Sequence, residues 1–519
     1  MKKLTGDEPE ETPLTTENEA VEEKEEKTTT AHEGNSAVAE TIVPYSNNST
    51  ASEISEFLKT QTQENAPTNY VATPIVTENN ANVTPSTPIQ QDWQQLTHQR
   101  TEAERNVGLA AYQLPPTFDI FVGDNQPTAQ YGILGVTAEY EQKIAMDLNG
   151  TNTISLFGVQ GAGKSYSIGT VTEMVLKQFP QVNVLQTPLA GVIFHYSESE
   201  DYKPEFTSMI MPNQRSNEVQ KLKQIYGADP DRVKDIVLLV PKDKLQQRRA
   251  EYPNIAVVPI SFASSELGIK EWKFLMGVSN NSALYIKQFN NLMRTIRSDL
   301  TLQSLQEAIE STKLMSPAQK ELARVRLSLA KEFINDELEL KNLVRPGRLL
   351  LVDLRDELIE KEDALSIFVI MLNIFASAKR EDGSAFNKFI VFDEAHKYMG
   401  NKNLTNVIVE TIREMRHKGV TLMIASQDPP SLPTEIIELS SMLIAHRFNS
   451  PQWLKHIQKS VTHLAHLNPE DMANLKQGEA FLWTNKASDA SFTQRAMKIR
   501  TRPRITQHGG ATLTAGQTH

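Results

Sequence analysis

The possible folds of this chain are limited most strongly by one short segment. Residues 152–157, NTISLF, are apolar, and the glycine-rich sequence GVQGAGKS follows at once as residues 158–165. A helical pattern then covers residues 164–178. A buried strand that enters a helix through a tight glycine loop is a building unit of α/β folds with a parallel sheet.

Apolar and helical segments alternate along most of the remaining chain. The other expected strands are residues 117–122, 143–148, 191–196, 236–240, 256–260, 348–353, 389–393, 421–426, 442–446 and 479–483. Helices are expected at residues 364–379 and 404–418 and over most of residues 283–343. Because the strands are continuously apolar, we expect an α/β fold with a mostly parallel sheet and helices on both faces.

The composition excludes several kinds of site. The 519 residues contain no cysteine, which rules out a disulfide scaffold, a thiolate zinc site, an iron–sulfur cluster and a cysteine nucleophile. Hydrophobic residues make up 39% of the chain, enough for a large core. The net charge of −11 means that any nucleic-acid contact needs a local basic surface.

The first 105 residues are expected to form a disordered acidic and polar arm. Residues 1–40 contain twelve acidic residues and four lysines, and residues 41–100 are rich in Thr, Asn, Ser, Gln and Pro. Such a segment cannot bury enough apolar surface to offset its ordering entropy. A tether or solubilising tail is favoured, with a specific partner-docking role as the alternative.

The remaining chain divides into five expected parts. These are a short β-rich lead-in at 112–150, a first core part at 151–269, a helical insertion at 270–345, a second core part at 346–505 and a flexible tail at 506–519.

No membrane association is expected. The N-terminal sequence MKKLTGDEPEETP lacks the apolar run of a secretory signal. The longest apolar stretch, residues 364–378, is too short to span a bilayer and predicts a buried helix. We therefore expect a cytoplasmic protein.

The glycine-rich loop matches the pattern G-x-x-x-x-G-K-[ST] in its required position between a strand and a helix. Its backbone N–H groups and the helix N-terminus are suited to cradling phosphate oxygens. Lys164 would bridge the β- and γ-phosphates of ATP, and Ser165 would ligate Mg²⁺. The expected nucleotide-binding residues are Gly158, Gln160, Gly161, Ala162, Gly163, Lys164, Ser165 and Tyr166.

Two acidic residues at strand ends are candidates for the magnesium ligand. Asp353 ends RLLLVD and Asp393 ends FIVFD, but only Asp393 is followed directly by a second acid, Glu394. We expect Asp393 to bind Mg²⁺ and Glu394 to polarise the attacking water, with Asp353 as the alternative ligand. His396 completes the letters DEAH without the other motifs of DEAH-box helicases, and it is interpreted together with Lys397 as an exposed loop residue.

A polar amide ends the strand at 421–426. Gln427 follows TLMIAS and precedes the proline-rich loop DPPSLP. It is expected to sense the γ-phosphate or orient the lytic water, and the rigid loop would relay hydrolysis. A simple turn at the strand end is the alternative.

Five motifs in order resemble the HerA–FtsK superfamily of P-loop ATPases, closest to HerA-like ATPases. They are GVQGAGKS at 158–165, VFDEAHKYM at 391–399, REMRHKG at 413–419, LMIASQDPPSLP at 422–433 and LIAHRFNSP at 443–451. The resemblance covers about residues 115–505 and includes the position of the helical insertion. It implies a RecA-like P-loop NTPase fold.

The resemblance also implies a hexameric ring that translocates double-stranded DNA through its channel. ATP would lie between subunits, with an arginine reaching across. Arg447 resembles the arginine at the end of the family's corresponding strand, and Arg416 resembles the arginine of its REgR-type helix. Either could neutralise phosphoryl charge in the neighbouring subunit, and a surface ion pair is the alternative for each.

Two departures from the family leave the partners open. HerA proteins carry an N-terminal β-barrel that docks a nuclease, whereas about forty ordered residues precede the glycine loop here, so a nuclease or other effector is only a candidate partner. The tail from Arg495 has five basic and no acidic residues, RAMKIRTRPRITQHGG. It is expected either to touch DNA or to pack over a neighbour's nucleotide.

The sequence thus favours an ATP-driven, helicase-like DNA translocase acting in DNA processing, conjugation or phage defence. A nucleotide-controlled assembly switch that activates a partner without translocation is the alternative. A secretion-coupling ATPase is a third and weaker hypothesis, since no membrane anchor is expected.

Overall fold

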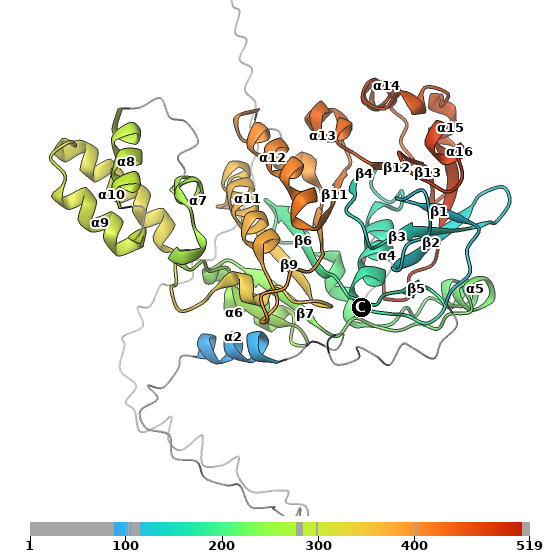
Figure 1. The fold of residues 1–519 in the computed structure, drawn as a ribbon, viewed down its shortest axis with the longest axis horizontal. Helices are drawn as coiled ribbons and strands as arrows, with labels where there is room; N and C mark the ends of the chain where they lie inside the picture. Colours follow the sequence, from blue (N-terminus) through green and yellow to red (C-terminus); the bar gives the residue numbers. More distant parts are fainter. Residues whose placement is uncertain are drawn as a thin grey trace, which may run out of the picture. The chain divides into compact units, whose positions relative to one another are not determined.

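The computed structural model describes residues 88–99, 101, 104, 115–276, 284–296, 299–399 and 402–510, and its central feature is one 14-stranded sheet (Figure 1). Eight neighbouring strands are parallel. In spatial order they are β12 (Met442–His446), β4 (Thr153–Phe157), β11 (Val420–Ser426), β10 (Lys388–Phe392), β6 (Ala190–Ser197), β9 (Leu349–Arg355), β7 (Ile236–Val240) and β8 (Ala256–Pro259). Every residue of β4, β10, β11 and β12 is buried, as expected for strands covered on both faces.

The sheet continues beyond β12 with mainly antiparallel pairs. This half contains β13 (Glu479–Thr484), β14 (Met497–Thr501), β2 (Tyr131–Thr137), β3 (Lys143–Asp147) and β1 (Ile120–Val122), and β5 (Asn183–Val184) pairs with β2. The lead-in at 112–150 therefore supplies three strands to the main sheet. The strand expected at 117–122 begins only at Ile120.

Two apolar clusters lie on opposite faces of the sheet. On β10, Ile390 and Phe392 belong to one cluster, whereas Phe389 and Val391 belong to the other. This alternation follows from the two-residue period of a strand. The structure is therefore an α/β P-loop NTPase fold with a mostly parallel sheet and helices on both faces.

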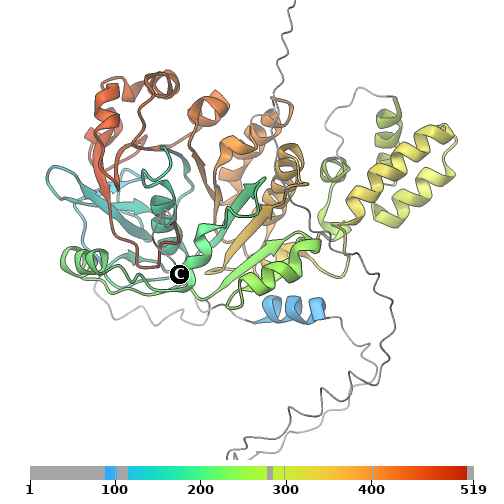
Figure 2. The same cartoon turned by 180° about the vertical axis from the view of Figure 1, so that it is seen from behind.

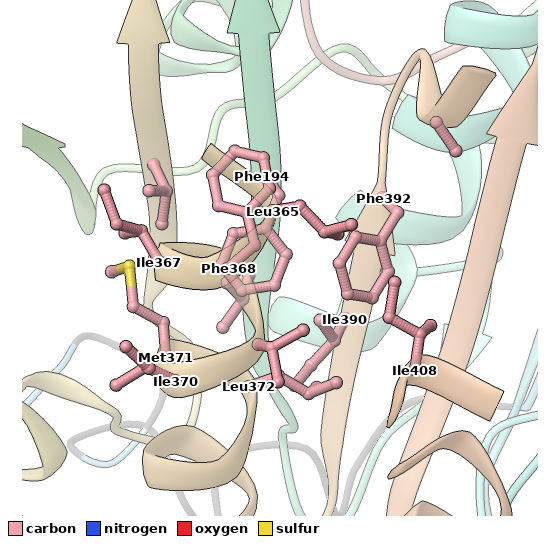
Figure 3. Packing of buried hydrophobic residues seen from close by; sticks show 14 of the residues in the cluster. Phe194, Leu365, Ile367, Phe368, Ile370, Met371, Leu372, Ile390, Phe392 and Ile408 are labelled. Carbon is pink, nitrogen blue, oxygen red and sulfur yellow. The ribbon is translucent and has the colours of Figure 1, made fainter. Parts of the chain in front are cut away.

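The first face is covered by α11 (Lys361–Ser377) and α12 (Lys402–Met415). The Phe368 ring of α11 lies 4.6 Å, between centroids, from the Phe194 ring of β6 (Figure 3). The prediction of a buried helix at 364–378 is confirmed, since α11 is buried almost all round. Among the described residues, no helix combines the length and apolar character needed to cross a bilayer.

The second face is covered by α4 (Lys164–Leu176), whose Ile168, Val171 and Met174 belong to the other cluster. The remaining core helices are α5 (Ser216–Tyr226), α6 (Leu245–Glu251), α13 (Thr434–Glu438), α14 (Pro451–Ser460), α15 (Pro469–Ala473) and α16 (Ser491–Gln494). Short 3₁₀ segments are η2 (Glu205–Ile210), η3 (Lys242–Lys244), η4 (Ser264–Glu266), η6 (Leu340–Leu343), η7 (Ala395–Lys397), η8 (Arg416–Lys418), η9 (Pro429–Ser431) and η10 (Thr462–Leu464).

The segment expected as a helical insertion contains α7 (Ile269–Leu275), α8 (Leu284–Thr295), α9 (Leu302–Ser311) and α10 (Pro317–Lys331). Figure 2 shows α8–α10, in yellow-green, gathered as a separate helical group. The side chains of Thr301 and Ser316 cap α9 and α10 by accepting hydrogen bonds from backbone N–H groups of the first turns.

The arm expected to extend to residue 105 ends earlier. Most of it lies outside the described residues, but α2 (Pro88–His98) is helical. Its Trp93 is 3% exposed and belongs to the core cluster, and Asp92 pairs with Arg249 at 2.5 Å. The boundary at 105 is therefore wrong, because α2 lies within the expected arm and is held to the core by Trp93 and by the Asp92–Arg249 pair.

Candidate functional site

Three functional segments start from neighbouring strand ends. β11 lies between β4 and β10, and all three strands are parallel. Their carboxyl ends lead into the loop at 158–165, into Gln427 and into the pair Asp393 and Glu394. Crevices beyond the carboxyl ends of parallel strands are the usual binding sites of α/β folds.

The glycine-rich loop adopts backbone conformations that favour glycine. Gly158, Gly161 and Gly163 have φ values of +154°, +73° and +120°. A Cβ atom at Gly158 would lie 2.7 Å from the Cβ of His446. Because α4 begins at Lys164, its unpaired N–H groups and positive dipole end face the loop, as anion binding requires.

His446, at the end of β12, supports this loop from below. Its ring lies against Gly163, its Nε2 is 2.9 Å from Ser167 Oγ, and its Nδ1 is 2.9 Å from the Glu479 carbonyl oxygen. Burial lowers the pKa of the His446 imidazole to about 4, so the ring is neutral at pH 7. The sequence contains no signal for this contact, because it joins segments almost 280 residues apart.

Lys164 is 4% exposed and reaches the acidic residue that follows β10. Its Nζ lies 3.8 Å from Glu394 Oε1. Burial lowers the pKa of the Lys164 ammonium, and the carboxylates of Glu394 and Asp393 oppose that shift. The predicted phosphate-binding lysine and the predicted base thus face the same point.

Glu394 is held in an unusual conformation. Its φ and ψ angles are +50° and +41°, in the left-handed region that is uncommon for residues other than glycine. Its Oε1 accepts a hydrogen bond of 2.6 Å from Gln427 Nε2. Its Oε2 is buried and has no hydrogen-bond partner among the described residues. Strain together with a buried free acceptor is typical of a functional carboxylate.

Asp393 lies beside Glu394 at the end of β10. Burial, and then the adjacent Glu394 carboxylate, raise the pKa of Asp393 to about 7, while Lys164 opposes the shift. Two neighbouring carboxylates with one nearby cation favour binding of a further positive charge.

The interpretation of His396 as an exposed loop residue is wrong. Its side chain is 21% exposed, and its Nδ1 lies 3.4 Å from Glu394 Oε2. The same nitrogen lies 3.4 Å from the backbone N–H of Gln427. Lys397 is also partly buried, with its Nζ 4.2 Å from the centre of the Tyr202 ring. Both residues belong to η7, which follows directly on the left-handed backbone of Glu394.

Asp353, the alternative magnesium ligand, belongs to a different cluster. It lies on β9, and β6, β10 and β11 separate β9 from β4. Its carboxylate pairs with Arg355 Nη2 at 2.7 Å and with Arg248 Nε at 3.6 Å. These two arginines occupy the carboxylate, so the geometry favours Asp393 over Asp353 as the acid of this site.

The two candidate arginines lie at opposite ends of the parallel strands, Arg447 at the carboxyl ends and Arg416 at the amino ends. Arg447 follows β12, its side chain is exposed, and its carbonyl oxygen accepts from the backbone N–H of Val159 in the loop. Arg416 precedes β11 and donates to the Leu439 carbonyl oxygen at 2.7 Å. Because the seven residues of β11 follow Arg416, this arginine is about 20 Å from the carboxyl ends of the strands, where the site of its own chain lies.

A cavity of about 550 Å³ opens beside the loop. Its walls include Tyr226 of α5 and Gly478, Arg500 and Pro503 of the C-terminal region. Of the expected nucleotide-binding residues, Gln160, Gly161, Gly163, Lys164, Ser165 and Tyr166 line it, together with Glu394 and Gln427. Gly158 and Ala162 are buried beneath it.

The basic tail is divided between the core and the surface, since Arg495 is exposed and Arg500 lines the cavity whereas other basic residues of the tail are buried. Residues 497–501 form β14, and Arg502 and Arg504 are fully buried. Arg502 Nη1 pairs with Glu173 Oε1 of α4 at 2.5 Å, and Arg504 Nη1 pairs with Glu205 Oε1 at 3.3 Å. These arginines serve this chain's own core because the two acids neutralise them there.

The residues of the site fit a magnesium nucleotide. The glycine loop leaves room for backbone contact with phosphate, and Ser165 and Asp393 supply oxygen donors of the kind that Mg²⁺ prefers. Within the described part of the chain, no three His, Asp or Glu side chains are grouped as a metal site. Phosphate oxygens and water would therefore complete the coordination.

The sequence matches no family model and no curated protein. Among solved structures, VirB4 of Thermoanaerobacter pseudethanolicus is 13% identical with a TM-score of 0.48, covering 73% of this chain and 98% of that chain. The conjugative coupling protein TrwB is 10% identical with a TM-score of 0.44, covering 77% and 97%. The genome packaging NTPase B204 from Sulfolobus turreted icosahedral virus 2 is 12% identical with a TM-score of 0.31, covering 69% and 99%.

These similarities are too low to carry the assignment of the fold, which rests on the strand order and the glycine loop. The chain has a P-loop NTPase fold, and its motifs resemble those of the HerA–FtsK ATPases.

Proposed function

We propose that this chain is an ATP-hydrolysing motor that translocates or remodels double-stranded DNA as a ring-shaped oligomer. The observation that carries the hydrolytic part is the meeting of Lys164, Glu394 and Gln427 beside one glycine loop. The DNA-directed part is supported by the order of the five motifs that resemble HerA–FtsK ATPases.

The proposed mechanism assigns one task to each side chain. The loop N–H groups and Lys164 bind and orient the triphosphate. Glu394 Oε2 is the proton acceptor for the attacking water, because it is the carboxylate oxygen without a hydrogen bond. Gln427 holds Oε1 and thereby fixes the direction of Oε2. Ser165 and Asp393 would hold Mg²⁺, which when bound supplies charge neutralisation at the phosphates.

In the proposed ring, Arg447 and Arg416 would act in the nucleotide site of a neighbouring subunit. Arg447 is exposed, and its backbone contacts Val159 of the glycine loop, so a neighbouring subunit could approach its side chain near the site. Arg416 is too far from its own site to act there, so any role in hydrolysis would be in a neighbour's site. A hexamer and an arginine acting between subunits remain parts of this proposal.

A second candidate is the nucleotide-controlled assembly switch. It is favoured by the burial of Arg502 and Arg504, because these residues cannot contact DNA from inside the core. The switch would use the same nucleotide site but would pass its state to a partner protein.

An ATPase assay with a titration of duplex DNA separates the two candidates. The motor predicts that DNA stimulates hydrolysis by the full-length wild type, and Glu394→Gln serves as the inactive control. Hydrolysis that is indifferent to DNA, together with an oligomeric state that changes with nucleotide, would favour the switch. Parallel reactions with GTP test the choice of ATP as the substrate.

A further inference from the structure

The cavity beside the glycine loop reaches beyond the residues that the motifs assign to phosphate binding. Its loop end is marked by Gly161, Lys164 and Ser165. Two further walls, α5 and the C-terminal segment 500–510, lie outside all five motifs. The phosphate chemistry leaves this second part of the cavity without a role.

Tyr166 connects the loop to both of these walls. It follows Ser165 in the first turn of α4. Its hydroxyl group donates to Glu218 Oε2 of α5 at 3.0 Å and accepts from the backbone N–H of Arg504 at 2.8 Å. α5 and the C-terminal segment therefore meet at the first turn of the helix that follows the loop.

α5 turns one face toward the cavity. Glu218, Lys221 and Ile225 all line it, and their spacing of three and four residues places them on one side of the helix. Ile225 lies seven residues after Glu218, which is about 10 Å along the helix axis. Ile225 is 37% exposed, and the adjacent Tyr226 also lines the cavity. The helix thus leads from the Tyr166 contact to apolar side chains.

The opposite wall is held rigidly by buried charges. Pro503 lines the cavity, and its two neighbours Arg502 and Arg504 are fully buried. Arg502 pairs with Glu173 and Arg504 with Glu205, as described above. Because both neighbours are anchored in the core, the Pro503 ring has a fixed position at the cavity wall.

Both walls meet the same hairpin, which closes the far end of the cavity. Arg500 Nη2 lies 2.8 Å from Oε1 of Glu141, in the turn between β2 and β3. Lys143 Nζ, at the start of β3, lies 5.9 Å from the centre of the Tyr226 ring. Arg500 and Tyr226 therefore face each other across the end of the cavity that the hairpin borders.

The chemistry of this end suits an uncharged, partly apolar group. Ile225, Tyr226 and Pro503 supply apolar surface, and the Arg500 guanidinium is already neutralised by Glu141. Small-molecule sites commonly combine apolar walls with a few polar groups in this way. Beyond its phosphates, a nucleotide consists of an uncharged ribose and a flat base, which match such a surface.

We propose that Ile225, Tyr226 and Pro503 bind the ribose and base of the nucleotide whose phosphates lie at the glycine loop. The nucleoside is then enclosed between α5 and the C-terminal segment of the same chain, not by a neighbouring subunit. This inference rests on the proposed nucleotide site and deepens it by locating the nucleoside.

The test compares ADP with pyrophosphate, which has the phosphates but no nucleoside. Affinities of the full-length chain for both ligands are measured by titration calorimetry with Mg²⁺ present. Ile225→Ala should weaken ADP binding about tenfold, the lower end of the effect of removing a methylene contact from a binding pocket. Pyrophosphate affinity should stay at the wild-type value. Leu322→Ala is the matched control, because Leu322 is an aliphatic residue of α10 that is 50% exposed and lies outside this cavity.

Pro503→Ala tests the opposite wall by the same comparison. It should also weaken ADP binding without changing pyrophosphate binding. Wild-type ADP affinity in either variant would overturn the inference. An equal loss of ADP and pyrophosphate affinity would overturn it as well, because the side chain would then act on the loop. If thermal unfolding shows that Pro503→Ala does not fold, Ile225→Ala decides alone, since its side chain is partly exposed.

The inference and the proposed function can fail separately. If the wild type binds neither ADP nor pyrophosphate, the proposed function is wrong. If the wild type binds both ligands and the Ile225 and Pro503 variants bind ADP as tightly as the wild type, the proposed function stands and only the inference is wrong.

Discussion

Replacing Glu394 by glutamine tests the proposed chemistry most directly. Glutamine has nearly the same shape, and its carbonyl oxygen can still accept the 2.6 Å hydrogen bond from Gln427 Nε2. The other end of the side chain becomes an NH₂ group where Oε2 now lies. The variant therefore keeps the packing of the site and loses only the proton acceptor and its charge.

The size of the effect follows from that single loss. A positioned general base contributes about 10²- to 10⁴-fold to rate, which corresponds to about 3–5 kcal/mol of the activation barrier. Nucleotide binding should not weaken, because removing the Glu394 charge lowers the pKa of Asp393 and leaves that carboxylate more readily ionised. Hydrolysis should thus fall while nucleotide binding is retained.

Single-turnover hydrolysis and ATP affinity should be measured on the same preparation. Glu414→Gln is the control, because Glu414 is exposed on α12, away from the cavity, and pairs with Lys418 at 3.5 Å. A Glu394→Gln hydrolysis rate within about threefold of the wild-type rate would refute the assignment of the base. Loss of ATP binding would instead show that the carboxylate holds the loop together.

Three further predictions concern charge, packing and assembly. The pKa of Asp393 is raised to about 7 in the folded, nucleotide-free chain, whereas in the unfolded chain this carboxyl group loses its proton near pH 4. Between these two pH values the folded chain binds the extra proton, so Asp393 should make the free energy of unfolding fall as pH rises. Comparing thermal unfolding of the wild type and Asp393→Asn across that range checks this, and identical pH profiles would contradict it. Deleting residues 1–87 should leave ATPase activity and stability unchanged. Trp93→Ala should instead lower the free energy of unfolding by about 3–5 kcal/mol in urea titrations, since Trp93 is 3% exposed. Equal stability of the two variants would contradict the role given to α2. Arg447→Ala subunits mixed with Lys164→Ala subunits should regain part of the wild-type ATPase activity, and the absence of any rescue would count against Arg447 acting between subunits.

The sequence was sufficient to predict the centre of the sheet and the loop beside it. The strands ending near residues 157, 393 and 426 are long apolar segments, and such segments have few alternatives to a buried strand. Because parallel neighbours end at one edge, Lys164, Glu394 and Gln427 could be expected to converge. Their local motifs carried enough information for this.

The parts that the sequence did not predict depend on contacts between distant residues. β14 has the sequence MKIRT, whose charges suggest an exposed tail, yet it pairs with both β13 and β2. Arg502 is buried because Glu173 receives it, and those residues are 329 positions apart. Glu205 lies in a polar loop segment, and its carboxylate contacts His508 and Arg504, which lie about 300 positions later in the chain. No local pattern marks such partners.

The fully buried pair of Glu173 and Arg502 also limits how this chain can change over evolution. Losing either residue alone would leave an unbalanced charge inside the core, a defect that commonly costs about 3–5 kcal/mol. Replacing both by apolar residues of similar volume would avoid that defect. Among homologous chains the two positions should therefore covary, so that a substitution at one is accompanied by a substitution at the other.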